Sequence, residues 1–375
     1  MPGIVLRTPD AVCVAHTPPM LWAMGSDSFV MALISAAAPL GITVSYPMLK
    51  GLSATAFRLM FAPNWQRYAP DALQGYDHTR LAYGALGLLA DPLEIDPADS
   101  DACQQMHSLI RERIEAGYPL LGLQLMGWED WGVIAGVTGA DVTGAGYIGD
   151  GATLLCRTLH VQEDDLTPAR CWPWLVQAIS SAGPAPSRKG SVMRSLRVAL
   201  ELHETAAYGA YLSGQAAYHA WIDGLHEESF YTPFESCSPA DYADQITRLK
   251  AADAANLQAD RPLDCAYLER AHVNHWRLKS LTDARKAASK YLEEAAVLFG
   301  GEPGARLAAA GRDYAEVTTL LAMARPFAPA EHQLESQPWT QRQRDKQAAF
   351  MQQALEVEEA AVQAIRAALS RMTLK

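Results

Sequence analysis

A run of small polar residues followed directly by an apolar segment is the feature that most limits how this chain can fold. Residues Ser26–Ser28 have side chains that cap helix N-termini, and the apolar run Phe29–Leu40 begins at the next position. Pro39 and Gly41 are residues that end a helix. The pattern therefore predicts a buried, capped helix close to the N-terminus, whose exposed N–H groups favour negative charge.

The middle of the chain has the pattern of a sheet that follows helices. Asp99–Ala116 has helical spacing of its apolar residues. Tyr118–Met126 and Trp131–Val137 are short apolar runs that predict two core strands, with the loop Gly127–Asp130 between them. Ala152–Thr158 predicts a further strand. This order of elements predicts an α+β domain with an antiparallel sheet.

Two other segments complete the expected organisation. Ile42–Tyr46 is rich in β-branched residues and predicts a short strand closed by Pro47. Ser180–Gly190 has the Gly, Pro and Ser content of a domain boundary. We therefore expect an α+β domain over residues 1–185 and a helical domain over residues 190–375. Helical spacing is found in Ser191–Tyr211, Gln215–Leu225, Pro239–Gln258, Cys265–Phe299, Pro303–Ala324 and Thr340–Met372.

Composition limits the classes of partner. A formal net charge of −11 argues against a general nucleic-acid binder, which needs a basic surface. The N-terminus lacks the pattern of a signal peptide, and no apolar run reaches the roughly 20 residues that span a bilayer. The six cysteines form no CxxC pair, so we expect neither a disulfide framework nor a zinc site. These features together predict a soluble, cytoplasmic protein without membrane partners.

Several short motifs, taken in order, carry a resemblance to a known family. They are GSDSFVMALISAAAPLGITVSY, KGLSATAFRL with Trp65 after it, IEAGYPLLGLQL followed by WGVIAGV, and GQAAYHAWIDGL in the helical part. In this order the chain resembles the papain-like, C39-peptidase-like proteins related to the N-terminal domain of the butirosin biosynthesis protein BtrH. The resemblance implies a papain-like fold over the first domain, with a helical C-terminal extension.

The resemblance also implies where catalytic residues would lie. Active members of the family use a Cys at the start of the first long helix and a His at the start of the late strand, as nucleophile and base. Here the helix start carries Ser26, Asp27 and Ser28, and the strand start carries Asp130 followed by Trp131. A carboxylate is a weak base unless burial raises its pKa. The resemblance therefore implies a retained scaffold that has lost the thiol chemistry.

Each residue near these two positions also has an ordinary structural interpretation. Ser28 is either a nucleophile or, with Ser26 and Asp27, part of a helix cap. Glu129 and Asp130 are either an acid–base pair or a cation-binding rim, or else an exposed acidic turn. Cys13 and His16, predicted on one strand, would point to opposite faces and form no catalytic pair.

Arginine and tryptophan residues near the motifs suggest ligand contacts. Arg58 lies among apolar residues, so it either binds the anionic part of a ligand or pairs with an acid such as Asp27. Trp65, Trp128 and Trp131 either line a small-molecule site or pack in the core.

Metal and cofactor signals are weak. His272 and His275 share a helix face, but no acid or Cys completes a metal site in register. Neither GxGxxG nor GxxxxGK[ST] occurs, and Gly139–Gly151 is not a phosphate loop. We therefore expect no cofactor and no metal.

Three functional hypotheses remain. The first is a small-molecule or peptide-binding protein whose former active-site cleft uses Arg58, Trp131 and the Ser28 cap, the cap N–H groups serving an anion. The second is an acyltransferase or amide hydrolase that uses Ser28, or a Cys from elsewhere, with Asp130, His16 or His78 as base. The third is a homo-oligomeric scaffold that pairs through the apolar stripe of Thr340–Met372.

Overall fold

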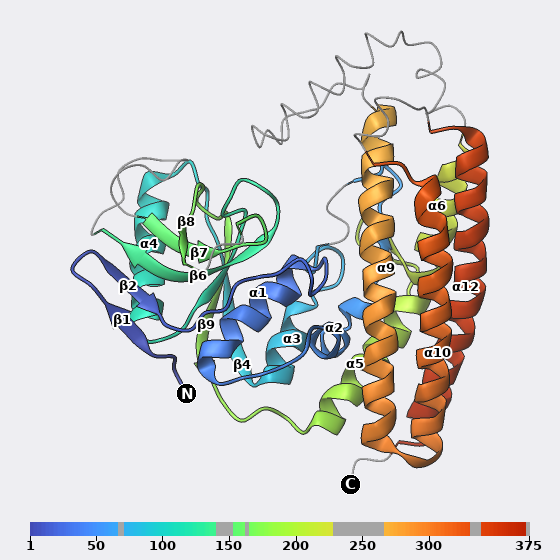
Figure 1. The fold of residues 1–375 in the computed structure, drawn as a ribbon, viewed down its shortest axis with the longest axis horizontal. Coiled ribbons are helices and arrows are strands. Elements are labelled where there is room, and N and C mark those ends of the chain that lie inside the picture. Colours follow the sequence, from blue (N-terminus) through green and yellow to red (C-terminus); the bar gives the residue numbers. More distant parts are fainter. Residues whose placement is uncertain (67–70, 140–152, 162–164, 228–265, 331–338, 373–375) are drawn as a thin grey trace. The chain divides into compact units, whose positions relative to one another are not determined.

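The computed structural model describes residues 1–66, 71–139, 153–161, 165–227, 266–330 and 339–372. The chain forms two compact units (Figure 1). The sheet unit comprises residues 1–49 and 82–186, and the helical unit comprises residues 50–81 and 187–375. The protein is therefore a mixed α/β chain with a curled antiparallel sheet and a C-terminal helical region.

The sheet unit is built on strands that all pair in the antiparallel sense. Its strands are β1 (Val5–Arg7), β2 (Ala11–Val14), β4 (Leu88–Glu94), β5 (Leu120–Leu123), β6 (Trp131–Thr138), β7 (Thr153–Arg157), β8 (Thr167–Pro168) and β9 (Leu175–Ala182). The main path through the sheet is β1-β2-β6-β5-β9-β4, and β7 pairs with both β6 and β8.

Strand β6 is the centre of this sheet. On one edge β5 pairs with its first half and β2 with its second half, while β7 pairs along the other edge. A register shift between Ile134 and Gly136 bends the pairing with β7. Three partners on one strand curl the sheet into a half-barrel. Gly136 fits this crowded position because a Cβ atom there would lie 2.6 Å from the sulfur of Cys13.

Two helices cover opposite faces of β6. Helix α1 (Ser28–Ala37) packs Phe29 against Trp131. Helix α4 (Ser100–Glu115) shares a core cluster with Ile134, to which it contributes Ile110 among others. Trp131 and Ile134 differ by an odd number of positions, so they point to opposite faces of the strand. Both faces of β6 are therefore buried.

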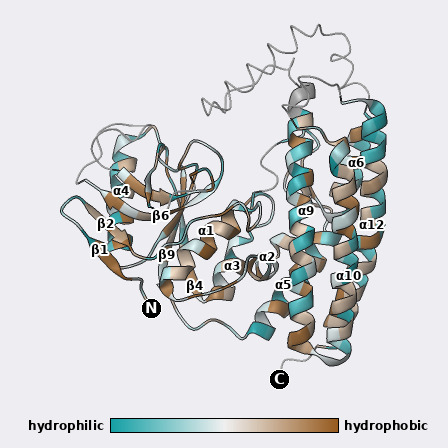
Figure 2. Cartoon of the chain, in the orientation of Figure 1, coloured by the Kyte–Doolittle hydropathy of each residue, from teal (hydrophilic) through white to brown (hydrophobic). Residues whose placement is uncertain are grey.

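The helical unit consists mainly of long helices that lie side by side. Its main elements are η2 (Thr55–Phe57), β3 (Met60–Phe61), α5 (Arg188–Glu204), β10 (Ala207–Tyr208), β11 (Tyr211–Ser213), α6 (Gly214–His226), α9 (Ala266–Phe299), α10 (Gly301–Ala324) and α12 (Gln341–Leu369). Helices α2 (Tyr46–Leu52) and α3 (Thr79–Leu86) join the two units in sequence. Hydrophilic and hydrophobic residues alternate along α9 and α12 (Figure 2).

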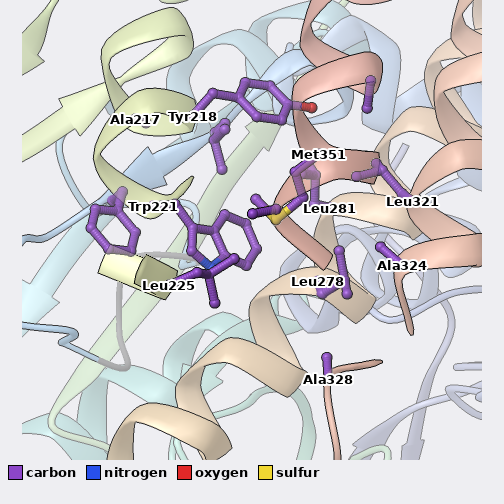
Figure 3. Packing of buried hydrophobic residues seen from close by; sticks show 14 of the residues in the cluster. Ala217, Tyr218, Trp221, Leu225, Leu278, Leu281, Leu321, Ala324, Ala328 and Met351 are labelled. Atoms are coloured by element: carbon purple, nitrogen blue, oxygen red, sulfur yellow. The ribbon is translucent and has the colours of Figure 1, made fainter. Parts of the chain in front are cut away.

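The apolar faces of these helices meet in one core. Figure 3 shows Trp221 and Leu225 of α6 beside Leu278 of α9, Leu321 of α10 and Met351 of α12, and all five are fully buried. The stripe expected on the last helix is part of this packing.

The stripe of the last helix is buried inside the helical unit. Leu355, Val362 and Ile365 are each at most 2% exposed. The capping box at Thr340 and Gln343 begins the helix at the predicted position. Helices α6, α10 and α5 pack against α12, and Phe350, Val357 and Leu369 of the stripe are half-buried. The structure therefore gives the scaffold hypothesis no support.

Most predicted elements of the sheet unit are confirmed. The helix after Ser26–Ser28, the helix at Asp99–Ala116 and the three predicted strands correspond to α1, α4, β5, β6 and β7. The strand predicted at Ile42–Tyr46 is wrong. Ser45 Oγ instead accepts a hydrogen bond from Met48 N at 3.3 Å and starts α2, in which Pro47 occupies the first turn.

The sequence predicts the unit boundary at residue 186, but it does not predict that residues 50–81 belong to the helical unit. The boundary at residue 186 lies within the predicted segment Ser180–Gly190. Residues 50–81 belong to the helical unit, although they precede most of the sheet unit in sequence. The predicted helix Ser191–Tyr211 ends at Glu204, because a hairpin of β10 and β11 follows. The predicted helix Pro239–Gln258 lies outside the described residues.

Candidate functional site

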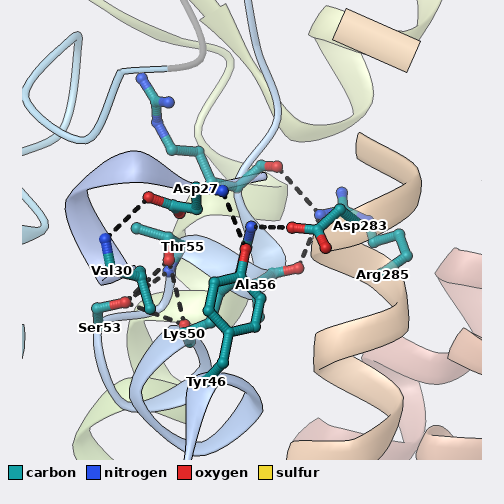
Figure 4. A network of polar contacts seen from close by, with 10 residues as sticks. Asp27, Val30, Tyr46, Lys50, Ser53, Thr55, Ala56, Asp283 and Arg285 are labelled. Atoms are coloured by element: carbon teal, nitrogen blue, oxygen red, sulfur yellow. Dashed lines mark hydrogen bonds and ion pairs between the residues drawn. The ribbon is translucent and has the colours of Figure 1, made fainter. Parts of the chain in front are cut away.

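The start of α1 is held by a side-chain cap and by a tyrosine hydroxyl. Asp27 is the N-cap residue, and its carboxylate accepts a hydrogen bond from Val30 N at 3.1 Å. Tyr46 Oη accepts a hydrogen bond from Asp27 N at 3.1 Å (Figure 4). A Cβ atom at Gly25 would lie 2.1 Å from the Tyr46 ring, so this close approach requires glycine. These contacts fix the backbone that leads into Ser28.

Ser28 touches the start of β6. Its Oγ accepts a hydrogen bond from Trp131 N at 3.2 Å. The ring of Trp131 is buried and meets the ring of Phe29 edge-on, with 5.7 Å between centroids. The two positions that the sequence analysis singled out, the helix start and the strand start, therefore lie side by side.

The loop between β5 and β6 sets the position of Asp130. Gln124 N donates to Asp130 O at 3.1 Å, and Gly127 N donates to Gln124 O at 3.0 Å. Gly127 has a φ of +86°, a left-handed conformation that favours glycine. Leu123 pairs with Trp131, so Asp130 is the last loop residue before the strand. Its side chain is 34% exposed.

His160 is the partner of Asp130. Its Nε2 donates to Asp130 Oδ2 at 2.9 Å. Because a carboxylate only accepts, Nε2 carries the ring proton, and Nδ1 is the lone-pair nitrogen whenever the imidazole is neutral. A β-bridge between Thr158 and Val161 places His160 in the two-residue turn after β7. The pair therefore joins two neighbouring loops of the sheet.

Arg157 supports this turn from inside. Its Nε donates to Thr17 O at 3.3 Å, and its Nη1 donates to Asp165 O at 2.5 Å. The side chain is buried, so the guanidinium links the end of β7 to both flanking segments. This arrangement orders the backbone around His160.

Two exposed tryptophans flank the imidazole. The ring of Trp128 stacks on His160 with 5.5 Å between centroids, and the ring of Trp22 meets it edge-on at 6.2 Å. Trp128 is 46% exposed and Trp22 is 42% exposed. We refer to Trp22, Ser28, Trp128, Asp130 and His160 as the Asp130–His160 site. It combines aromatic surface, a carboxylate and an imidazole on the sheet unit.

The other predicted residues of the sheet unit contribute less. Ser26 Oγ is buried and has no hydrogen-bond partner among the described residues. Glu129 is half-buried in the loop before Asp130. Trp131 supplies its backbone N–H, while its side chain is a core residue. Asp27 uses its carboxylate to cap α1, which places negative charge where an anionic ligand was expected.

Arg58 and Trp65 belong to the helical unit. Arg58 is 7% exposed, and its Nη2 donates to Gln74 O at 2.7 Å. Trp65 is 3% exposed and packs against Phe61 in the core, so the core alternative applies to it. The guanidinium of Arg270 lies 5.3 Å above the Trp65 ring. Both residues are thus held by their own unit.

The described cysteines are poor nucleophiles. Burial raises the pKa of the Cys13, Cys103 and Cys171 thiols and raises that of Cys156 to about 12. Thiols with a raised pKa are protonated at neutral pH and react slowly. Cys237 and Cys265 lie outside the described residues.

The histidines proposed as bases occupy other environments. His16 follows β2, which ends at Val14, so it does not share a strand with Cys13 as predicted. His78 is fully buried in the helical unit, with Nδ1 2.8 Å from Ser53 O. Burial and the charge of Arg58 lower the pKa of His78 to about 3. We therefore interpret His78 as a residue that stabilises the fold of the helical unit and not as a catalytic base.

The metal hypothesis gains no support. His275 Nδ1 lies 2.9 Å from Ala328 O, and the rings of His272 and His275 both contact Trp276. Among the described residues, no group of three or more His, Cys, Asp and Glu side chains is placed to hold a metal ion.

His160 and Trp22 were not predicted from the sequence. The register between β6 and β7 explains the position of His160. Val133 pairs with Arg157 in the antiparallel register of β6 and β7. Asp130 precedes Val133 by three residues, and His160 follows Arg157 by three. Extending the register therefore puts Asp130 opposite His160. Trp22 lies in a turn, and no periodic pattern in that segment predicts which residues its side chain contacts.

Comparison with protein-family models gives no match to this chain, and comparison with curated proteins also finds no relative. Within the described part of the chain, no helix combines the length and apolar character needed to cross a membrane. The function is therefore argued from the geometry of the Asp130–His160 site.

Proposed function

We propose that this chain is a papain-like-fold protein that binds an amine-bearing small molecule or a basic peptide at the Asp130–His160 site, without thiol catalysis. The observation that carries the proposal is the pair of exposed tryptophans beside a hydrogen-bonded Asp–His pair. Aromatic faces attract cations, and a carboxylate adds charge complementarity. The papain-like assignment is supported by the helix start at Ser28 lying against the strand start at Trp131.

The charge around the site favours a cationic ligand over an anionic one. Asp130 places a carboxyl group at the site, and Asp27 and Glu129 are the sequence neighbours of Ser28 and Asp130. The guanidinium of Arg157 lies buried at the end of β7, where it donates to the backbone oxygens of Thr17 and Asp165. The N–H of Val30 is already bonded to the carboxylate of Asp27. The cap therefore has less to offer an anion than the sequence suggested.

The proposal is tested by thermal unfolding of the full chain with a panel of small amines, short basic peptides, neutral sugars and carboxylates. A ligand that binds only the folded state raises Tm, and the rise grows with the logarithm of the ligand concentration once that concentration exceeds Kd. We expect amines or basic peptides to raise Tm, and both Trp128→Ala and Asp130→Asn to abolish the rise.

Trp276→Ala is the matched control. Trp276 is 45% exposed and lies beside histidines, but it belongs to the helical unit. It should leave the ligand response intact. A panel in which no basic compound raises Tm, or a response that survives both site variants, contradicts the proposal.

A second candidate function is supported by one specific observation. The Asp130–His160 pair leaves Nδ1 as a basic nitrogen, and Ser28 lies beside the strand start that follows Asp130. An acyltransferase or amide hydrolase with a serine nucleophile uses these three groups, with Ser28 as the nucleophile, His160 as the base and Asp130 as the carboxylate that orients the base. It predicts a covalent adduct with an acylating probe that is lost in both Ser28→Ala and His160→Gln. An unmodified protein by mass spectrometry removes this candidate.

A further inference from the structure

The groups that would recognise a cationic ligand all contact one side chain of the protein itself. His160 Nε2 donates to Asp130 Oδ2 at 2.9 Å. The Trp128 ring lies over the imidazole with an interplanar angle of 27°, and the Trp22 ring meets it edge-on at 79°. A carboxylate and aromatic faces attract an imidazolium as they attract any other cation. His160 therefore occupies the environment that a cationic ligand needs.

The imidazole can change its charge near neutral pH. Because Nε2 carries the proton that is bonded to Asp130, Nδ1 is the nitrogen that takes a second proton. The His160 side chain is 27% exposed, so this proton can come from water. Imidazole is the side chain that ordinarily changes charge between about pH 5 and 8. The ring is thus either neutral or cationic, depending on pH.

Other charged and titratable groups lie near the ring or next to residues of the site. Arg157 at the end of β7 is buried, and its guanidinium donates to the backbone oxygens of Thr17 and Asp165. Glu163 and Asp164, which follow in sequence, lie outside the described residues. The remaining groups are four carboxyl groups and a second imidazole, namely Asp27, Glu129, Asp130, Asp165 and His16. Of these, the second imidazole is the group from which a pH effect of His160 must be separated.

We propose that the charge of His160 regulates the Asp130–His160 site, which binds a cationic ligand while the imidazole is neutral and excludes it once Nδ1 is protonated. The imidazolium competes with the ligand for the same carboxylate and the same tryptophan rings, and the two positive charges repel. Because the ligand binds the neutral ring, binding releases a proton wherever the free ring is charged. Affinity therefore falls as pH falls. This inference rests on the function proposed for the site.

The test measures Kd by isothermal titration calorimetry of the full chain at pH 8 and at pH 5.5. The probes are tetramethylammonium and an acetylated tri-arginine amide, which keep their charge at both values. Equal ionic strength holds screening constant. Affinity should fall by up to about tenfold for each pH unit below the midpoint of the ring titration. An equal Kd at both values overturns the inference and leaves the proposed function standing, whereas a chain that binds neither probe at pH 8 contradicts both.

A second measurement uses the wild-type chain alone. The NMR signals of the His160 ring protons are followed through a pH titration, with and without a saturating concentration of the probe that binds. Because linkage is reciprocal, the bound probe should lower the pH at which the ring takes its second proton. A midpoint that stays in place while the probe is bound overturns the proposal.

Variants assign the pH dependence to one residue. His160→Gln keeps a donor toward Asp130 Oδ2 and does not titrate, so its Kd should be equal at the two pH values, whatever its absolute affinity. His16→Asn is the matched control, because His16 is an exposed imidazole of the same unit with a φ of +59°, which Asn tolerates. It should keep the wild-type pH dependence. A pH dependence that persists in His160→Gln, or that disappears in His16→Asn, overturns the proposal.

Discussion

Two of the ion pairs that join distant segments of this chain, one in each unit, differ in burial and in how completely hydrogen bonds engage the charged groups. In the helical unit, Arg285 Nη2 lies 2.6 Å from Glu358 Oε1, with the two side chains 1% and 2% exposed. Tyr218 also donates to Glu358, at 2.8 Å. In the sheet unit, Asp130 and His160 are 34% and 27% exposed.

The two pairs differ in whether their polar atoms are fully engaged by hydrogen bonds within the chain, and this difference indicates which pair stabilises the fold and which is available to a ligand. Nη1 of Arg285 donates to Ala56 O and Arg58 O at 3.0 Å, so the buried guanidinium is fully engaged by its own chain (Figure 4). Asp130 and His160 instead have solvent and two tryptophan rings around them. We therefore expect changes at Arg285 to affect folding, and changes at Asp130 to affect binding.

The largest expected effect is the loss of the buried pair. Glu358→Leu leaves Arg285 charged and buried, which should lower the free energy of unfolding by about 3–5 kcal/mol. Urea unfolding measures it. The double variant Arg285→Met/Glu358→Leu removes both charges and should recover most of the loss. A single variant as stable as wild type would show that the pair is not a structural centre.

The second effect is a pH dependence that arises from His78. Its folded pKa of about 3 lies below the unfolded value of 6.5, because burial and Arg58 disfavour the charged ring. Between these values the unfolded chain binds the proton and the folded chain does not, so stability falls as pH falls. The contribution is roughly 2–3 kcal/mol between pH 6.5 and 4.5.

His78→Gln tests this dependence by urea unfolding at the two pH values. Glutamine does not titrate and can still donate to Ser53 O. Its stability should change less with pH than that of the wild-type chain. An equal slope in both proteins would assign the acid sensitivity to other groups.

Removal of the Ser28 hydroxyl should have a smaller effect. Ser28→Ala takes away the acceptor for Trp131 N, which should lower the free energy of unfolding by about 1 kcal/mol. If Ser28 only joins the helix to the strand, ligand affinity is retained. Affinity that disappears while stability is unchanged would give Ser28 a direct role in binding.

The smallest effect on stability is expected at Asp130. Asp130→Asn breaks a partly exposed pair, which should change the free energy of unfolding by less than about 1 kcal/mol. Asp345→Asn is the matched control, because Asp345 lies 3.1 Å from His226 on the surface of the helical unit. Both should unfold much like the wild-type chain. Only Asp130→Asn should lose the response to basic ligands.

The sequence predicted local structure better than long-range pairing. The capped helix α1, the helix α4 and the last helix follow from periodicity and cap residues within each segment. Strands β4 and β9 were not predicted, although they pair with each other along seven residues of β4. Leu88–Glu94 contains Asp and Pro and is largely exposed, so it lacks the apolar pattern of a core strand.

The candidate site shows the same limit. Ser28 and Asp130 could be singled out because the resemblance implied catalytic residues at the start of the first long helix and at the start of the late strand. His160 could be found only through the register between β6 and β7, which no single segment contains. Arg58 and Trp65 were expected at the site, yet their partners are residues of the helical unit, and the return of residues 50–81 to that unit has no local signal.

The most direct test of the account is the indole N–H spectrum of the full chain during titration with the amine or basic peptide that raises Tm. The chain has nine tryptophans, and single Trp→Phe variants assign Trp22, Trp128 and Trp276. The account predicts that the signals of Trp22 and Trp128 shift with ligand while that of Trp276 stays in place. Unchanged Trp22 and Trp128 signals at saturation would contradict binding at the Asp130–His160 site.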